Sequence, residues 1–229
     1  MGRSRLAALL ALTAIYRILT VDLVRRRLFA DSTTDKGAEA LLATAKKKGL
    51  MRSQRIVGNL HGYSLTEAGA KLVGLSGPCF RKPHGTQAIF TRMLVARFFL
   101  GGQMQGDPLT AYEFRKKFPK HAEHPGSIDR FFIDRSGESK RLTIIVPDLN
   151  ATFAVVANKA RCAVSERKKN PEFRLMMYAK PTMFGVAVLT PYEATKPERI
   201  REALATEKFH YTVYHVPGLE DLFMFGRGE

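Results

Sequence analysis

Residues 32–69 constrain the fold more than any other stretch, because signals for a helix, a hairpin and a second helix follow one another there. Ser32 and Asp35 have the spacing of a helix-capping box. Apolar residues then recur at i, i+3, i+4 and i+7, namely Ala38, Leu41, Leu42 and Ala45. Gly49, directly after three lysines, is typical of a helix end. The pattern predicts a half-buried helix over residues 32–48.

The opposite side of this helix is polar, basic and free of bulky side chains. At about 100° per residue, that side carries Thr33, Lys36, Ala40, Ala43, Thr44 and Lys47. Such a face can approach the edge of a DNA groove, and we expect Lys36 and Thr33 to lie nearest the bases. The alternative is a small α+β unit whose lysines only solvate its surface.

Two strand-like runs follow, residues 51–57 and 63–65, separated by the glycine-rich stretch 58–62. Thr66 can cap a further helix through Val73. The order helix, strand, glycine-rich turn, strand and L-T-x-x-G resembles the winged helix-turn-helix domains of bacterial regulators and replication proteins. The most specific part of the resemblance is the sequence Tyr63-Ser64-Leu65-Thr66-Glu67-Ala68-Gly69.

The resemblance implies that the 32–48 helix enters the major groove while the preceding helix, residues 21–30, crosses the phosphate backbone. The arginine triplet of that preceding helix is then a phosphate contact or, equally, a solvated face. The residues expected to bind DNA are Arg25, Arg26, Arg27, Thr33, Thr34, Lys36, Thr44, Lys47, Arg52, Arg55 and His61.

Composition agrees with a polyanionic partner. The chain has 229 residues, 45% of them hydrophobic, a formal net charge of +16 and a pI near 10.1. Charge alone does not separate nucleic acid from an anionic membrane, but no basic amphipathic helix stands apart as an anchor. Two cysteines in a chain of this length favour a reducing, cytoplasmic setting. Neither cysteine has partners at zinc-ligand spacing, and we expect no bound metal or other cofactor.

Three parts are predicted along the chain: a DNA-binding domain over 1–75, a linker and connecting helix over 76–102, and an α/β domain over 103–229. The N-terminal run 6–16 mimics a signal peptide, but Arg17 interrupts it and we interpret it as a buried helix, residues 4–19. The apolar helix predicted over 86–100 must pack either on its own chain or on a second copy, as in a homodimer.

The third part alternates strand and helix patterns, so the expected fold class is α+β with an α/β C-terminal domain. Strands are predicted over 128–133, 141–146, 173–178, 183–189 and 209–216, and helices over 110–118, 151–169 and 197–206. This order resembles the restriction-endonuclease-like fold. With the first domain in front, the chain resembles the replication-relaxation family of plasmid and mobile-element proteins.

A nuclease of that fold needs two carboxylates to hold Mg²⁺ and a lysine to orient water. Asp129 or Asp134, Asp148 and Lys159 could supply them. The second strand carries Val146 where related sequences place an acid, so we expect a degenerate, inactive domain in which Asp148 or Asn150 caps a helix. One side of that helix would still be basic, through Lys159, Arg161, Arg167, Lys168 and Lys169.

The sequence thus favours a double-stranded DNA-binding protein, dimeric, acting in plasmid or mobile-element replication, transfer or transcriptional control. The first alternative is a Mg²⁺-dependent DNA endonuclease that its winged helix targets. The second is an assembly factor that docks a relaxase, replication or transcription protein through its C-terminal domain.

Overall fold

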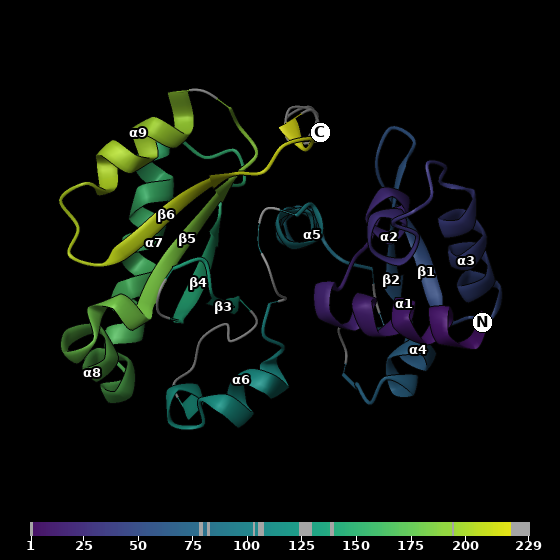
Figure 1. Ribbon diagram of the computed structural model, residues 1–229, viewed down its shortest axis with the longest axis horizontal. Helices are drawn as coiled ribbons and strands as arrows, with labels where there is room; N and C mark the ends of the chain where they lie inside the picture. The colour runs from purple at the N-terminus through teal and green to yellow at the C-terminus, as the bar shows by residue number, and fades with distance from the viewer. Residues whose placement is uncertain are drawn as a thin grey trace. The chain divides into compact units, whose positions relative to one another are not determined.

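The computed structural model describes residues 2–77, 80–81, 83–102, 104, 108–123, 130–137, 140–193 and 195–220. Helices and strands are mixed along the chain, as the expected α+β class requires (Figure 1). The chain divides into two compact units, Met1–Gly102 and Gln103–Glu229. Within the described residues, no helix has both the length and the hydropathy needed to cross a bilayer.

Unit 1 contains five helices and one hairpin among its described residues: α1 (Gly2–Tyr16), α2 (Val21–Leu28), α3 (Lys36–Lys47), β1 (Met51–Val57), β2 (Leu60–Leu65), α4 (Glu67–Leu72) and α5 (Thr86–Leu100). The helix predicted over 4–19 ends three residues early, with Arg17 at φ 69°. The reason is that Leu19 joins the hairpin edge, exchanging two backbone hydrogen bonds of 2.8 and 2.9 Å with Tyr63. Thr20 then caps α2 as predicted.

The start of α3 differs from the sequence-based prediction. Ser32 does not cap the helix, because its hydroxyl donates to the Thr34 carbonyl and accepts from the Thr34 N–H instead. Helical geometry begins only at Lys36, after Asp35, whose side chain makes no capping bond. Thr33 and Thr34 therefore precede the helix in a local turn. The predicted inward stripe is confirmed: Ala38, Leu42 and Ala45 are fully buried.

The hairpin is tighter than predicted. Val57 pairs with Leu60, so the turn contains only Gly58, at φ 52°, and Asn59. The second strand consequently begins at Leu60 rather than Tyr63. A turn of this kind needs positive φ at its first central position, which glycine adopts at little cost.

The L-T-x-x-G motif closes the hairpin against the end of α3. Thr66 caps α4 by accepting from the Gly69 N–H and donates to the Gly49 carbonyl at 2.6 Å. Gly69 lies so close to Leu50 that a Cβ on it would stand 2.0 Å from the Leu50 oxygen. That oxygen accepts from Thr66 N and the Leu50 N–H donates to Ala45, so the Leu50 backbone is fixed. The motif therefore has a packing role in unit 1.

Replacing Gly69 with alanine is expected to destabilise unit 1 by about 3 kcal/mol, because the new methyl overlaps a backbone that is hydrogen-bonded on both sides. The measurement is urea unfolding followed by circular dichroism. Gly137→Ala is the matched control, since a Cβ there meets nothing within 4 Å. Equal midpoints for Gly69→Ala and the unsubstituted protein would contradict the packing role.

The segment predicted as a linker with a connecting helix belongs to unit 1. Helix α5 has the predicted bounds, Thr86–Leu100. Its Arg97 guanidinium bonds the Asp22 carboxylate of α2 at 2.5 Å, and Phe99 contacts the Tyr16 ring of α1 at 6.3 Å between centroids. Helix α5 thus packs on its own chain, which is one of the two possibilities that the sequence left open.

Unit 2 contains α6 (Ala111–Lys117), β3 (Phe131–Asp134), β4 (Arg141–Pro147), α7 (Phe153–Lys168), α8 (Pro171–Ala179), β5 (Phe184–Thr190), α9 (Thr195–Leu204) and β6 (His210–His215), with short 3-10 turns at Lys120–Glu123 and Pro181–Met183. The strands form one sheet in the order β3-β4-β5-β6. The β3 strand is antiparallel to β4, whereas β4, β5 and β6 are parallel. The predicted hairpin is confirmed from Phe131 onward, and Ile128 lies outside the described residues.

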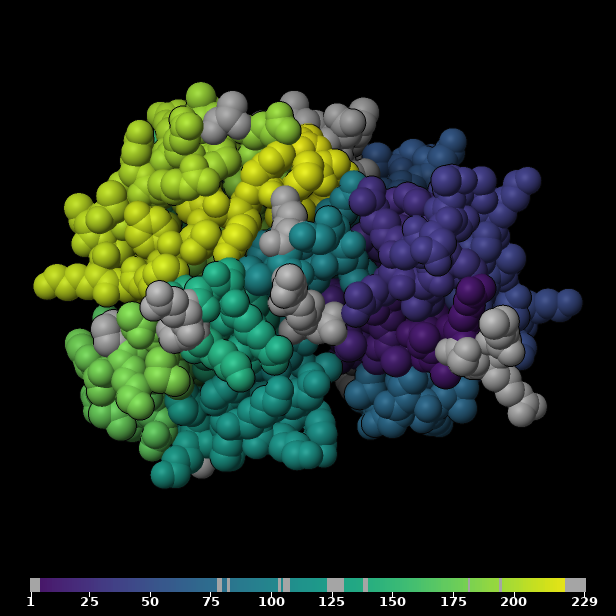
Figure 2. Space-filling view, viewed as in Figure 1, coloured from purple at the N-terminus to yellow at the C-terminus, as the bar shows by residue number. Residues whose placement is uncertain are grey.

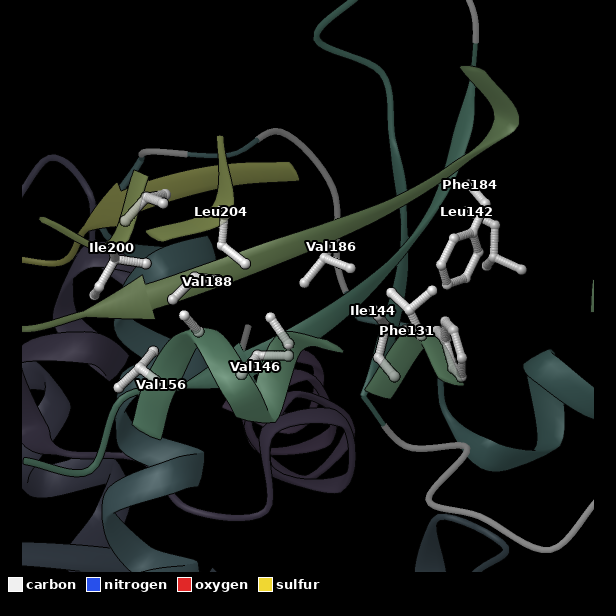
Figure 3. Close-up of a cluster of buried hydrophobic side chains, with 14 of the residues drawn as sticks. Phe131, Leu142, Ile144, Val146, Val156, Phe184, Val186, Val188, Ile200 and Leu204 are labelled. Carbon is white, nitrogen blue, oxygen red and sulfur yellow. The ribbon is translucent and has the colours of Figure 1, made fainter. Parts of the chain in front are cut away.

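One face of this sheet holds the core of unit 2. Residues of like parity on the strands, including Ile144, Val186 and Val188, pack with Val156 of α7 and Ile200 of α9 (Figure 3). The helices that connect the parallel strands therefore cover the same face of the sheet. Right-handed crossovers place them there because the order β4-β5-β6 advances across the sheet in one direction.

The strand predicted over Phe173–Tyr178 is wrong, because these residues lie in α8. Asn170 caps this helix, its side-chain oxygen accepting from the N–H groups of Glu172 and Phe173, and Pro171 occupies the first helical position. An asparagine-proline pair thus starts a helix here, and Phe173 is buried in the core.

Candidate functional site

The side of α3 opposite its buried stripe is exposed. Lys36, Ala40, Thr44 and Lys47 are all exposed, as the sequence predicted. The blue-purple part of the chain that includes α3 forms part of the visible surface in Figure 2. Lys36 and Lys47 are eleven residues apart, or about 16 Å along the helix axis. Neither lysine forms an ion pair with an acid in the described part of the chain. Between the two lysines this side of α3 carries the small side chains Ala40 and Thr44. We call these four residues the basic strip.

The hairpin presents its own cations near its turn. Arg55 and His61 are directly opposite each other in the β1–β2 register, and both are exposed. The Arg55 Nε donates to the Gly58 carbonyl at 2.6 Å, so the turn orients the guanidinium. The structure therefore brings together two of the three predicted hairpin residues.

The third, Arg52, has a different role. Its guanidinium donates to the carbonyls of Phe80 and Arg81, each at 3.0 Å, which anchors the segment before α5 on β1. Burial lowers the pKa of Arg52 below its usual range. This arginine is a structural cation, and the long-range contact that holds it could not be read from local sequence.

The three arginines of α2 differ in their contacts. Arg25 bonds the carboxylates of Asp22 and Asp35 at 3.1 and 2.9 Å. Arg26 bonds Asp22 at 3.0 Å. Arg27 is exposed, and no ion pair is recorded for it within the described residues. Of the triplet, Arg27 is thus exposed without a recorded ion pair among the described residues, whereas Arg25 holds α2 to the turn before α3.

An open cleft of about 580 Å³ lies between α2, α3 and the hairpin. Asp22, Asp35 and Glu39 line it, together with Lys46 and His61. Glu39 is about 80° around the helix from Lys47 by its position in the sequence. Helix α3 therefore has an acidic flank beside the cleft, and the side that carries Lys36 and Lys47 lies next to this flank.

His84 lies beside Arg52 in the segment that covers β1. Its ring Nδ1 is 2.6 Å from Nη1 of Arg92, a group that can only donate, and its backbone is bonded on both sides by the Gln54 amide. Burial, then the charges of Arg92 and Arg52, lowers the pKa of His84 from 6.5 to about 4. The imidazole is therefore neutral in the folded chain at neutral pH.

The depressed pKa predicts acid destabilisation of unit 1. Between pH 6.5 and about 4 the unfolded state binds a proton at His84 that the folded state does not. Stability therefore falls as the pH falls through this window. Because the ring is partly exposed, we expect a loss of about 1 kcal/mol. Urea unfolding at pH 7 and pH 4.5 should show a smaller pH effect for His84→Gln, and an unchanged effect would contradict it.

The unit boundary changes where the charge excess lies. Unit 1 holds 17 Lys and Arg against 5 Asp and Glu, a formal +12, and unit 2 holds 20 against 16, a formal +4. A boundary at residue 75, as predicted from the sequence, would give each side a formal +8, because the cations of α5 and its preceding segment would then belong to the second part. The electrostatic attraction for a polyanion is thus concentrated on unit 1.

The proposed nuclease residues do not come together in the described structure. Asp129 lies outside the described residues. Asp148 is fully buried, and its carboxylate binds Lys196 Nζ at 2.7 Å and Thr190 Oγ1 at 2.9 Å. Lys159 is exposed on α7. The lysine that lies next to Asp148 is Lys196 instead.

Asp134, the other candidate for the first carboxylate, is also engaged. It accepts from Ser136 and lies 3.5 Å from an Arg141 guanidinium nitrogen, at the opposite end of β4 from Asp148. Nor is Asp148 the cap of α7, since Thr152 accepts from the Val155 N–H and Asp148 accepts from Ala151 before the helix begins.

The basic side predicted for α7 is partly engaged within unit 2. Arg161 bonds Glu207 at 2.6 Å and also the Ala203 carbonyl. Lys169 pairs with Glu166 three residues before it, Arg167 lies over the Phe131 ring, and Lys159 is exposed. Arg161 and Arg167 hold the helix to its neighbours, and the larger charge excess of unit 1 makes its exposed basic strip the better candidate site. No family model matches the chain, and neither a curated protein nor a solved structure is detectably similar to it.

Proposed function

We propose that unit 1 is a winged helix-turn-helix domain that binds double-stranded DNA, with the exposed strip of α3 in the major groove and the hairpin against the backbone beside it. The observation that carries the proposal is the strip itself: two exposed lysines about 16 Å apart, with only small side chains between them, on a unit with an excess of cations over acids of 17 to 5.

The physical argument is one of access and charge. A helix fits the major groove when the side chains on its outer face do not hold it away, and Ala40 and Thr44 leave that approach open. Lys36 and Lys47 can then neutralise phosphates at the two ends of the strip. Arg55 and His61 on the hairpin, with Arg27 on α2, would contact phosphates on either side.

The order of elements in unit 1 supports this assignment. Leu19, between α1 and α2, pairs with Tyr63 in an isolated antiparallel bridge at the β2 side of the hairpin. Helix α3 lies between this edge residue and the hairpin in sequence, as the recognition helix does in winged domains. Unit 2, with a hairpin followed by helix-connected parallel strands, is proposed as a degenerate nuclease-like domain that serves assembly.

The direct test is a titration of the full chain against labelled duplexes by fluorescence anisotropy, combined with sequencing of fragments selected from a random duplex pool. We expect saturable binding that weakens steeply with salt. A palindromic selected site would favour a dimer acting in plasmid or mobile-element replication, transfer or transcriptional control. No retention of duplex DNA at low salt would overturn the proposal.

A further inference from the structure

The carboxyl ends of three parallel strands of unit 2 meet at one edge of the sheet. Asp148 follows β4, Thr190 ends β5 and His215 ends β6. Thr190 donates to Asp148 at 2.9 Å and is the register partner of His215. The three positions are therefore neighbours along the edge where open α/β sheets bind their ligands.

His215 lies among two carboxylates at this edge. Its Nε2 is 3.2 Å from Glu220 Oε1 and 4.0 Å from Glu193 Oε1. One ligand atom from each of the three residues lies within 4.8 Å of the other two. Glu193 comes from the loop after β5. Glu220 follows the turn after β6, where Gly218 has φ 78°.

These separations match those of atoms that bind one metal ion. Metal–ligand distances of about 2.0–2.2 Å in tetrahedral geometry put neighbouring ligand atoms about 3.4 Å apart. The two His215 distances, 3.2 and 4.0 Å, lie on either side of that value. A hydrogen-bonded His–Glu pair alone would explain the contact with Glu220, but it would not need Glu193, whose side chain is 74% exposed.

Lys196 is also at this edge of the sheet, but its ammonium is engaged with Asp148 at 2.7 Å and lies over the Tyr192 ring at 4.0 Å. Its charge is therefore paired with Asp148 rather than with the two glutamates.

We propose that Glu193, His215 and Glu220 bind one divalent transition-metal ion, with Zn²⁺ the best-suited species. An imidazole nitrogen with two carboxylate oxygens is a borderline ligand set, and such sites bind Zn²⁺ more tightly than Mn²⁺ or Fe²⁺. Three protein ligands leave a coordination position for water. This site is separate from the DNA-binding strip of unit 1 and does not rest on it.

The test is calorimetric titration of Zn²⁺ into the chelator-treated full chain. We expect one saturable site per chain. Glu193→Gln should weaken it at least tenfold, because an amide oxygen carries no charge, and Glu193 is too exposed for the change to disturb folding. Glu198→Gln, the same substitution at an exposed position of α9, is the matched control and should leave the affinity unchanged.

A second readout separates coordination from nonspecific attachment. Zn²⁺ should raise the melting temperature of the unsubstituted chain and of Glu198→Gln, because a ligand bound only to the folded state stabilises it. It should not do so for Glu193→Gln or His215→Ala. Equal affinities in Glu193→Gln and Glu198→Gln, or no saturable binding in the unsubstituted chain, would overturn the metal site.

Discussion

Replacing Lys36 and Lys47 together with alanine is expected to weaken duplex DNA binding more than tenfold at moderate salt. Both ammonium groups stand on the exposed side of α3, and each phosphate they neutralise releases a condensed counterion. The slope of log affinity against log salt concentration should therefore fall by about two. Anisotropy titrations of the full chain at several salt concentrations measure both quantities.

The control for net charge is a second pair of exposed lysines. Lys116→Ala with Lys117→Ala on α6 removes the same charge from unit 2. That variant should bind duplex DNA within about twofold of the unsubstituted chain, because Lys116 and Lys117 are not part of the proposed contact surface of unit 1. Equal losses in the two double variants would place the interaction in overall charge and contradict a groove-binding strip on α3.

Replacing Asp148 with alanine is expected to lower the free energy of unfolding of unit 2 by about 3 kcal/mol. The carboxylate is fully buried, and its removal leaves the Lys196 ammonium, 19% exposed, without the partner it has at 2.7 Å. Thr190 loses its acceptor as well. Urea unfolding followed by circular dichroism measures the loss.

A double-mutant cycle identifies the cause. Asp148→Ala combined with Lys196→Ala should cost less than the sum of the two single variants by at least about 1 kcal/mol, because no charge is then left unpaired. Glu166→Ala, which breaks the exposed pair with Lys169, should change stability by under about 1 kcal/mol. Strict additivity at Asp148 and Lys196 would show that the pair is not coupled.

This second result also bears on the endonuclease alternative. Loss of plasmid cleavage in Asp148→Ala would ordinarily be taken as loss of a metal ligand. Because Asp148 is expected to stabilise unit 2 by pairing with Lys196, a cleavage assay on this variant is informative only beside an unfolding measurement. A variant that stays fully folded and loses cleavage would favour the nuclease interpretation over ours.

Local sequence predicted most of unit 1 because its signals are short-range. The inward stripe of α3, the bounds of β1 and the cap at Thr66 all depend on residues within a few positions of one another. The errors lie where a distant group competes. Leu19 leaves the first helix to pair with Tyr63, 44 positions away by residue number. In α8, the Asn170 cap outweighs an apolar run that resembles a strand.

The sequence by itself determined that this chain has an amphipathic, lysine-bearing helix followed by a closed hairpin, because periodicity and turn chemistry are local properties. Only the tertiary structure decided which cations are accessible. Arg25, Arg52 and Arg161 look equivalent to Lys36 and Lys47 in the sequence, yet each is bound by a carboxylate or carbonyl from another element. The partners of a long charged side chain depend on packing between segments, and so does the pairing of Asp148 with Lys196.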